Sequence, residues 1–349
     1  MKVDVDFCSS MFLLYRTLYP YNICFNSKYE PEIFQENENR LAVYNSFELE
    51  SLLKQKVQEV CNNGKACLAL SGGIDSAILA KFMPKGATAY TFRCVVPGVK
   101  VTDETARASY YAKECGLKHK IVDIYWDDME KFAPELMKHK GAPIHSIEVQ
   151  IAKAALEAKK DGFDTVIFGE SADVNFGGHD GLLSKDYYVS EFLERFAFVM
   201  PYKVLKKPQI YLDPVLKYSD NGNVDVHEFV RHQYYCESMG SYQNASKYAK
   251  MGFSAPYSES FLGTPLDYYA VRHGRSKYFV RDIFERLYPN VEIPKKIPMP
   301  RPMDEWLQNW DGPKRGEFIE NCQSILTGDQ KWMVWALEKF LDLIEDREY

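Results

Sequence analysis

The chain has 349 residues, enough for two modest domains or one large one, and its 46% hydrophobic and 26% charged residues are typical of an ordinary globular protein. Its formal net charge of −6 provides no overall basic field that would attract nucleic acid. No two of the eight cysteines have C-x-x-C spacing, which argues against a zinc ribbon, an iron–sulfur cluster and a thioredoxin-type redox pair.

The N-terminus carries Asp4 and Asp6 where a signal peptide would have a cationic region. The apolar stretch MFLLY is too short to cross a bilayer. We therefore expect a cytoplasmic protein with reduced thiols, with neither a membrane nor a nucleic acid as its partner.

The predicted elements begin with an irregular, aromatic stretch over about residues 1–50. It leads into a first helix in YNSFELESLLKQKVQEVC, whose apolar residues lie mostly on one helical face. We treat residues 1–60 as an N-terminal segment that ends in this helix.

Residues 61–185 alternate between strands and helices. We expect strands over residues 66–70, 87–96, 118–124 and 164–170, and helices over residues 75–82, 102–116, 126–139 and 146–160. This alternation predicts an α/β fold, with a parallel twisted sheet that has helices on both faces. After about residue 180 the strand signal fades, so residues 186–349 are expected to be a mostly helical part that completes the active site, either as a separate region or within one compact domain. Its last helix is expected over about residues 329–346.

The stretch LALSGGIDS stands where the first strand of this core ends and a helix begins. Ligands of parallel sheets bind at the carboxyl ends of the strands. Gly72 and Gly73 lack a Cβ, so their backbone can turn tightly and approach an anion, and the helix start adds free N–H groups. Ser71 and Ser76 can donate hydroxyl groups to the same anion. The stretch therefore predicts a phosphate site.

Asp75 places a carboxylate beside this phosphate site, where the two negative charges would repel each other. A divalent cation between them removes the conflict, and Mg²⁺ favours one or two carboxylates together with phosphate oxygens. The alternative is a strand–turn–helix corner with a capping aspartate. The stretch matches neither the Walker pattern nor the dinucleotide fingerprint.

A second stretch, VIFGESADVNFGGH at residues 166–179, places two acids after the fourth strand. Asp173 can share the cation held by Asp75. Glu170 can act as a general base toward an attacking amine. The alternative is a capping aspartate and a solvated glutamate in a loop.

These stretches carry a family resemblance. SGGIDS resembles the pyrophosphate loop of the N-type ATP pyrophosphatases, whose fold is adenine nucleotide alpha hydrolase-like, and the second stretch is similar to the G-E-G-A-D-E-x-F-G-G-Y signature of the asparagine synthetase family. The later segments RSKYFVRDIFERLYP, IPKKIPMP and MDEW fit the same family, so the resemblance covers about residues 60–310. It implies ATP and Mg²⁺, cleavage of ATP to AMP and pyrophosphate, and activation of a carboxylate or carbonyl oxygen as an adenylate.

The resemblance also implies roles for individual residues. Glu170 and Lys296 would be catalytic, with Lys296 neutralising charge on the pyrophosphate leaving group; Lys295 is the competing choice, and a solvated lysine pair is the alternative. Cys94, in YTFRCVVPG, would lie beside the adenine through its backbone. Asp75 and Asp173 would hold the metal. The expected contacts to ATP and pyrophosphate are Ala69, Leu70, Ser71, Gly72, Gly73, Asp75, Ser76, Cys94, Phe168 and Gly169.

The sequence departs from the family pattern in two ways. Lys2 follows Met1, and only 70 residues precede Ser71, so we do not expect the N-terminal glutaminase with a cysteine nucleophile that glutamine-dependent members of the family carry. We expect free ammonia, ammonia from a separate partner, or an amine as the nitrogen donor.

The second departure concerns the acceptor acid. Val174 replaces the second acid of the signature, and residues 142–150 contain no arginine, so aspartate is not the expected substrate. The candidate contacts to a different small carboxylate are His145, Ser146, Glu148 and Gln150, unless they lie on a surface helix.

These features predict an ATP-dependent ligase that forms amides or amidines. The alternatives are another PP-loop chemistry, such as thiolation or tRNA modification, and a non-catalytic nucleotide-binding protein.

Overall fold

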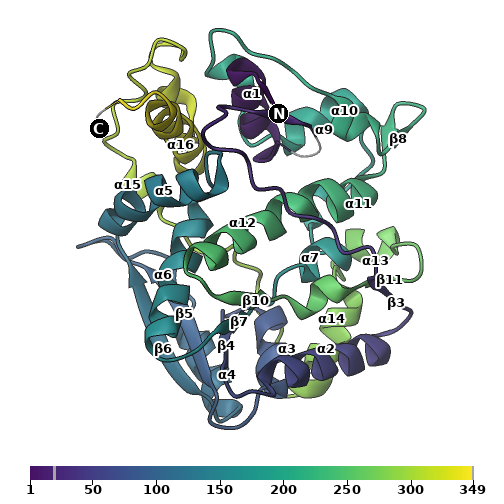
Figure 1. Ribbon diagram of the computed structural model, residues 1–349. Coiled ribbons are helices and arrows are strands. Elements are labelled where there is room, and N and C mark those ends of the chain that lie inside the picture. The colour runs from purple at the N-terminus through teal and green to yellow at the C-terminus, as the bar shows by residue number, and fades with distance from the viewer. Residues whose placement is uncertain (19–20, 348–349) are drawn as a thin grey trace.

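A five-stranded parallel sheet forms the centre of the protein in a computed structural model that describes residues 1–18 and 21–347 (Figure 1). The strands lie in the order β10-β7-β4-β5-β6, and every neighbouring pair is parallel. Their bounds are β4 (Ala66–Ala69), β5 (Thr88–Cys94), β6 (Lys118–Ile124), β7 (Thr165–Ile167) and β10 (Gly252–Ser254).

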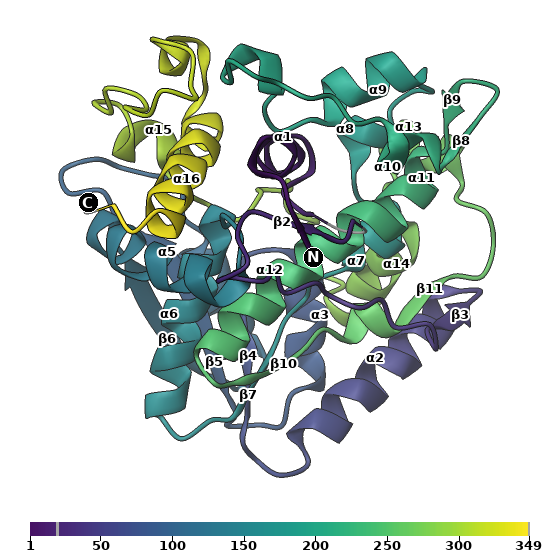
Figure 2. The same ribbon diagram turned by 45° about the horizontal axis from the view of Figure 1, so that its top comes forward.

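Helices cover both faces of this sheet, which confirms the predicted fold class (Figures 1 and 2). One face carries α2 (Ser46–Cys61), α3 (Ile74–Phe82), α4 (Thr105–Glu114) and α14 (Tyr278–Leu287). The other carries α6 (Ser146–Lys160), against which α5 (Trp126–Lys140) and α12 (Tyr235–Tyr248) pack. The helices predicted over residues 126–139 and 146–160 therefore match α5 and α6 almost residue for residue.

The chain order reverses at β4. The next strand in sequence, β5, lies on one side of β4, whereas β7 lies on its other side. An open parallel sheet binds its ligands at such a switch point, outside the carboxyl ends of the strands. The two motif stretches follow β4 and β7, so the topology brings them together at this point.

The prediction that residues 1–50 are irregular is wrong in one part. It contains α1 (Val5–Tyr15), which is buried along its whole length from Phe7 onward. A helix that is buried on all sides shows no amphipathic period, and α1 could therefore not be recognised from the sequence pattern. It packs against α16 (Gly328–Ile344), as Figure 1 shows for the purple and yellow helices.

The fading strand signal after residue 180 is misleading, because four strands of two or three residues lie in that part of the described chain. β10 pairs with β7 at the edge of the central sheet, and β11 (Ser260–Leu262) pairs with β3 (Leu41–Val43). Strands of three residues are too short to show alternation between apolar and polar side chains. The remaining elements are β1 (Lys2–Val3), β2 (Ile23–Cys24), α7 (Ala172–Asn175), α8 (Asp180–Leu183), α9 (Val189–Phe196), α10 (Asp213–Leu216), β8 (Ser219–Asp220), β9 (Asn223–Val224), α11 (Val226–Phe229), α13 (Tyr268–Arg272) and α15 (Met303–Trp306).

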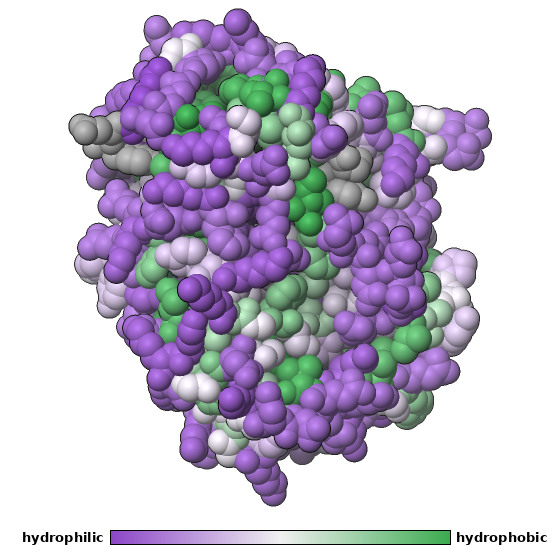
Figure 3. All heavy atoms as spheres, in the orientation of Figure 1, coloured by the Kyte–Doolittle hydropathy of each residue, from purple (hydrophilic) through white to green (hydrophobic). Residues whose placement is uncertain are grey.

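Hydrophilic residues cover most of the face drawn in Figure 3, and hydrophobic residues gather along the middle and at the top of that view. Within the described residues, no helix combines the length and the apolarity that crossing a membrane would require.

Candidate active site

The phosphate loop lies between β4 and α3 and is fixed by its own hydroxyl groups. The Oγ of Ser76 accepts a hydrogen bond from the Ser71 N–H at 3.0 Å, and the Oγ of Ser71 accepts one from the Gly73 N–H at 3.1 Å. Gly72 lies close to an ion pair, since an added Cβ would lie 3.0 Å from Nε of Arg107 and 3.1 Å from Oε1 of Glu104, and these two groups are 3.5 Å apart. The glycine therefore permits the close approach of the Glu104 carboxylate and the Arg107 guanidinium, and its predicted contact with phosphate stays a prediction.

The end of β7 packs directly on this loop. A Cβ on Gly169 would lie 2.9 Å from the backbone nitrogen of Ser76, so the approach of the β7 end to the first turn of α3 requires glycine. Ser171 adopts a left-handed conformation, with φ of 73°, as the chain turns into α7. At Gly178, an added Cβ would lie 2.1 Å from Oδ1 of Asp173. Gly178 therefore makes room for the Asp173 carboxylate, and Gly169 makes room for the start of α3.

A cavity of about 260 Å³ opens between the two strand ends. It brings together most of the predicted site residues, from segments more than two hundred residues apart. Those that line it are Ala69, Leu70, Ser71, Gly73, Asp75, Ser76, Phe168, Gly169, Glu170, Asp173, Lys295 and Lys296. Residues 293–300 form one wall of the cavity, and Tyr90, Thr91 and Phe92 of β5 contribute to another.

Glu170 faces the cavity with part of its surface, and α12 supports its carboxylate. Its Oε1 accepts a hydrogen bond from Oγ of Ser238 at 2.8 Å. Desolvation by the surrounding protein raises the pKa of Glu170, although the Ser238 hydroxyl opposes this shift. A carboxyl group with a raised pKa is better matched to accepting a proton near neutral pH.

Four charged groups meet at the floor of the cavity. The Nζ of Lys277 lies 2.8 Å from both carboxylate oxygens of Asp75 and 2.9 Å from Oδ1 of Asp173. The Nζ of Lys296 lies 2.9 Å from Oδ2 of Asp173 and donates to the Gly178 carbonyl at 2.9 Å. Burial alone would raise the pKa of Asp173, but the two lysines hold it well below its usual range.

Lys277 is the main site residue that sequence reasoning missed. The segment that contains it, RSKYFVRDIFERLYP, resembles the family, but the sequence indicates no role for Lys277 itself. Its partner Asp75 lies about two hundred positions earlier in the chain, a separation across which sequence pattern gives no signal. Glu104 and Tyr242, which also line the cavity, were missed for the same reason.

Cys94 lies behind the wall of the cavity. Its thiol donates to the carbonyl of Pro300 at 3.4 Å, and burial raises its pKa to about 12. A buried thiol with a raised pKa is a poor nucleophile, which fits the prediction that this residue acts without thiol chemistry.

The four candidate substrate contacts are buried, so the surface-helix alternative for them is wrong. Oε1 of Glu148 accepts from Lys140 Nζ at 2.6 Å, and its Oε2 accepts from Asn244 at 2.6 Å. Nδ1 of His145 and Nε2 of Gln150 have no hydrogen-bond partner among the described residues. None of the four lines the cavity. The role predicted for His145, Ser146, Glu148 and Gln150 therefore stays a prediction.

Comparison with models of protein families shows which family the chain belongs to. The family model described as asparagine synthase matches residues 48–254, more than half of the chain. The chain belongs to the asparagine synthase family. Membership confirms the resemblance inferred from the two motifs and makes the protein an ATP-utilising enzyme of the ligase or PP-loop type. The match ends before Lys277 and Lys296, so the cations of the site lie outside the matched region.

No curated protein matches the sequence. Among solved structures, the NMN synthetase from Francisella tularensis is 11% identical, with 73% of this chain and 99% of that chain covered and a TM-score of 0.28. The NH3-dependent NAD synthetase from Campylobacter jejuni subsp. jejuni is 14% identical, with 56% of this chain and 95% of that chain covered and a TM-score of 0.27. A U34-tRNA thiolase from Methanococcus maripaludis is 15% identical, with 76% and 92% covered and a TM-score of 0.25.

Proposed function

We propose that this member of the asparagine synthase family is an ATP-dependent ligase that forms an amide or amidine. It adenylates a carboxylate or carbonyl oxygen with release of pyrophosphate, and nitrogen from ammonia or an amine then displaces AMP. The observation that carries this proposal is the meeting of the phosphate loop, Glu170, Lys296 and the Asp75–Asp173 pair around one cavity.

The residues present fit a divalent cation. Asp75 and Asp173 together hold a single ammonium group at 2.8–2.9 Å, which shows that their oxygens converge on one cationic position. When bound there with ATP, Mg²⁺ would neutralise phosphate charge, as two carboxylates plus phosphate oxygens suit this ion. The loop from Ser71 to Ser76 supplies the N–H and hydroxyl groups that would orient the phosphates.

Lys296 and Glu170 serve different steps in this proposal. Lys296 lies on the wall formed by residues 293–300 and stabilises negative charge on the pyrophosphate as it leaves. Glu170 accepts a proton from the attacking nitrogen, and the Ser238 hydroxyl holds its carboxylate in place.

The acceptor is a small carboxylate other than aspartate, because Val174 is apolar and buried where the family signature has an acid. One helix, α12, contacts both Glu148 and Glu170, because its Asn244 donates to Glu148 at 2.6 Å and its Ser238 donates to Glu170 at 2.8 Å. The nitrogen donor is free ammonia, ammonia from a separate partner, or an amine, and we expect the isolated chain to release no glutamate from glutamine.

Product analysis tests the proposal. The purified protein is incubated with ATP, Mg²⁺, ammonium and a panel of small carboxylic acids, and nucleotide and acid products are identified by mass spectrometry. Formation of AMP and pyrophosphate with a new C–N bond is the expected result. A thiolated product, or ATP binding without any AMP, would contradict the ligase and favour the other PP-loop chemistries or a non-catalytic role. The absence of cysteine from the described cavity lining speaks against thiolation.

A further inference from the structure

The cation position between Asp75 and Asp173 is held by a side chain of the protein itself. Lys277 lies directly before α14, and its buried ammonium contacts both oxygens of Asp75 and one of Asp173. The two aspartates come from the starts of α3 and α7, so Lys277 joins two separate elements. Its Nζ lies where the two carboxylates would hold a divalent cation.

The surroundings are shaped around this lysine. Lys277 has φ of 52°, a left-handed conformation that residues with a Cβ rarely adopt. Its carbonyl accepts from the Arg281 N–H at 2.9 Å, and the Arg281 guanidinium donates to the Ser276 carbonyl at 2.7 Å. A Cβ on Gly178 would lie 2.7 Å from Cδ of Lys277, so this glycine leaves room for the lysine stem.

The charges at the cavity floor balance without a metal. Lys277 and Lys296 supply two positive charges, and Asp75 and Asp173 supply two negative charges. An ammonium and a divalent cation cannot occupy the same position between these two carboxylates. A cation that took them alone would leave Lys277 buried without its acceptors, which is costly in a low-dielectric site. A polyphosphate on the neighbouring loop would supply new acceptors and the negative charge that restores balance.

We propose that Lys277 is an exchangeable counter-ion. It holds the Asp75–Asp173 pair in the absence of nucleotide, and it passes that pair to a divalent cation only when polyphosphate arrives to accept its ammonium. This inference rests on the proposed function in one respect, namely that polyphosphate binds at the Ser71–Ser76 loop. It makes the divalent cation and the polyphosphate mutually dependent ligands, with weak binding of the cation alone.

Calorimetric titration tests the exchange without any turnover. Three probes are used: magnesium chloride alone, sodium pyrophosphate with EDTA, and preformed magnesium pyrophosphate. In the wild-type chain, magnesium pyrophosphate should bind about 5–150-fold more tightly than metal-free pyrophosphate, the usual range for coupled sites, and Mg²⁺ alone should bind weakly. In Lys277→Met, Mg²⁺ alone should bind at least about tenfold more tightly than in wild type, because its competitor is gone, while magnesium pyrophosphate should bind less tightly.

Three further variants make the result specific. Lys277→Gln removes the charge but keeps hydrogen-bond donors toward the aspartates. It replaces Lys277→Met if circular dichroism shows that the methionine variant does not fold. Lys277→Gln should show the same gain in Mg²⁺ affinity. Lys277→Arg keeps the charge and should retain weak Mg²⁺ binding. Lys140→Met removes another buried lysine, paired with Glu148 at 2.6 Å, and should leave Mg²⁺ binding unchanged.

The outcomes separate this inference from the proposed function. If neither neutral variant gains affinity for Mg²⁺ alone, or if wild type binds Mg²⁺ alone as tightly as they do, the exchange is overturned while the ligase proposal stands. If the affinities change as expected but product analysis finds no C–N bond, the exchange stands and the ligase proposal falls. If wild type binds no pyrophosphate in any form, both fail.

Discussion

At the scale of single residues, the site is organised by opposite charges that lie within hydrogen-bond distance of one another. Lys277 fills the cation position, and Glu104 lies against Gly72 of the phosphate loop. The Glu104 carboxylate accepts a hydrogen bond from the Gly72 N–H, a group expected to face phosphate. Both the cationic and the anionic positions are therefore held by side chains of the chain itself.

Replacing Lys296 and replacing Glu170 should impair different steps of the reaction, adenylate formation and amide formation respectively. Lys296→Ala should lower adenylate formation by about 10²–10³-fold, because one donor to developing charge is lost. Glu170→Gln keeps its size and its contact with Ser238 but loses the base, so it should still exchange labelled pyrophosphate into ATP while amide formation falls by about 10²–10⁴-fold. Isotope exchange isolates the first step. If both variants lose pyrophosphate exchange to the same extent, Glu170 is not the general base for the attack by nitrogen.

Glu104→Gln should bind pyrophosphate more tightly than wild type. The amide keeps the shape of the side chain but removes a negative charge from the phosphate loop, and we expect a gain of about tenfold or less for one partly screened charge. Titration with sodium pyrophosphate in EDTA measures it. Glu114→Gln, on the exposed end of α4, is the matched control and should not change the affinity. Weaker binding in Glu104→Gln would mean that this carboxylate orients the loop instead of competing for it.

At the scale of elements, the topology of the sheet explains why two motifs one hundred residues apart share one cavity. β4 and β7 are neighbours, and their carboxyl ends carry the phosphate loop and the Glu170 turn. Gly169 allows the β7 end to approach the first turn of α3. The turn into α7 is less well suited to its sequence, because Ser171 holds a left-handed conformation that glycine would adopt more easily.

Ser171→Gly should therefore be tolerated and raise the free energy of unfolding by up to about 1 kcal/mol, since it relieves the left-handed strain at some cost in chain entropy. Urea denaturation measures the change. Ser171→Ala is the matched control, because it loses the same hydroxyl contact to Met239 but keeps the strained Cβ. A glycine variant less stable than the alanine variant would show that the strain is negligible.

Elements with strong local patterns could be predicted from the sequence, and those defined by distant contacts could not. The buried strand before SGG and the amphipathic helices α5 and α6 have periodicities that can be recognised without the fold. β10 has three residues and exists because β7 offers it an edge. Lys277 follows the same rule, since its role depends on Asp75 and not on its own neighbours in the sequence.

At the scale of the whole molecule, buried histidines should make stability depend on pH. Desolvation, with a smaller contribution from Arg231, lowers the pKa of His227 on α11 to about 4. Between this value and the ordinary value near 6.5, the unfolded chain binds a proton that the folded chain does not. This group therefore contributes less stability as the pH falls through that window.

His227→Gln should remove this contribution. Between pH 7.5 and pH 4.5, wild type should lose about 2 kcal/mol more unfolding free energy than the variant does. Urea denaturation across this pH range measures the difference. His273→Gln replaces an exposed ring that stacks on Tyr269 and should follow wild type. Parallel pH profiles for wild type and His227→Gln would contradict the assignment.

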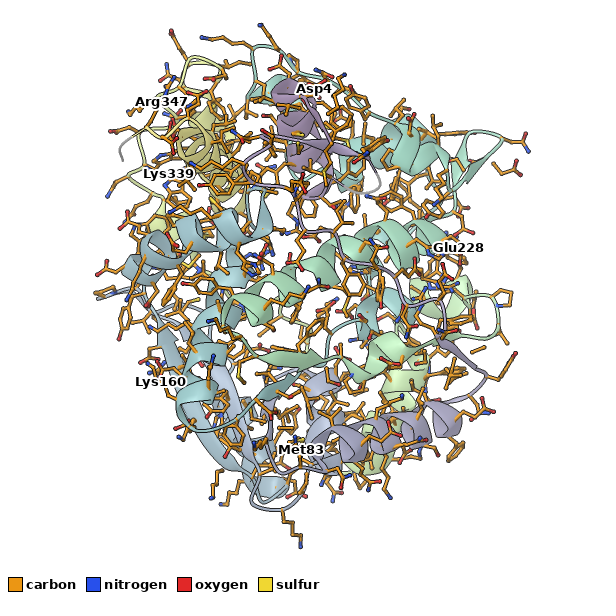
Figure 4. All side chains as sticks on the ribbon, in the orientation of Figure 1. Asp4, Met83, Lys160, Glu228, Lys339 and Arg347 are labelled. Atoms are coloured by element: carbon orange, nitrogen blue, oxygen red, sulfur yellow. The ribbon has the colours of Figure 1, made fainter. Side chains whose placement is uncertain are left out.

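The packing of α1 on α16 ties the first helix of the protein to its last. The chain after α1 contacts the same C-terminal region: Phe25 meets Phe340 edge-to-face with 5.1 Å between ring centroids, Asn26 donates to the Ile344 carbonyl, and Lys28 pairs with Asp346 just beyond α16. Figure 4 labels Asp4 and Arg347 in the same upper part of the molecule. On the ribosome, α1 emerges with its apolar surface uncovered, and its partner is made only some three hundred residues later. At about 5–20 residues per second, that surface stays exposed for tens of seconds, long enough for a chaperone to bind it.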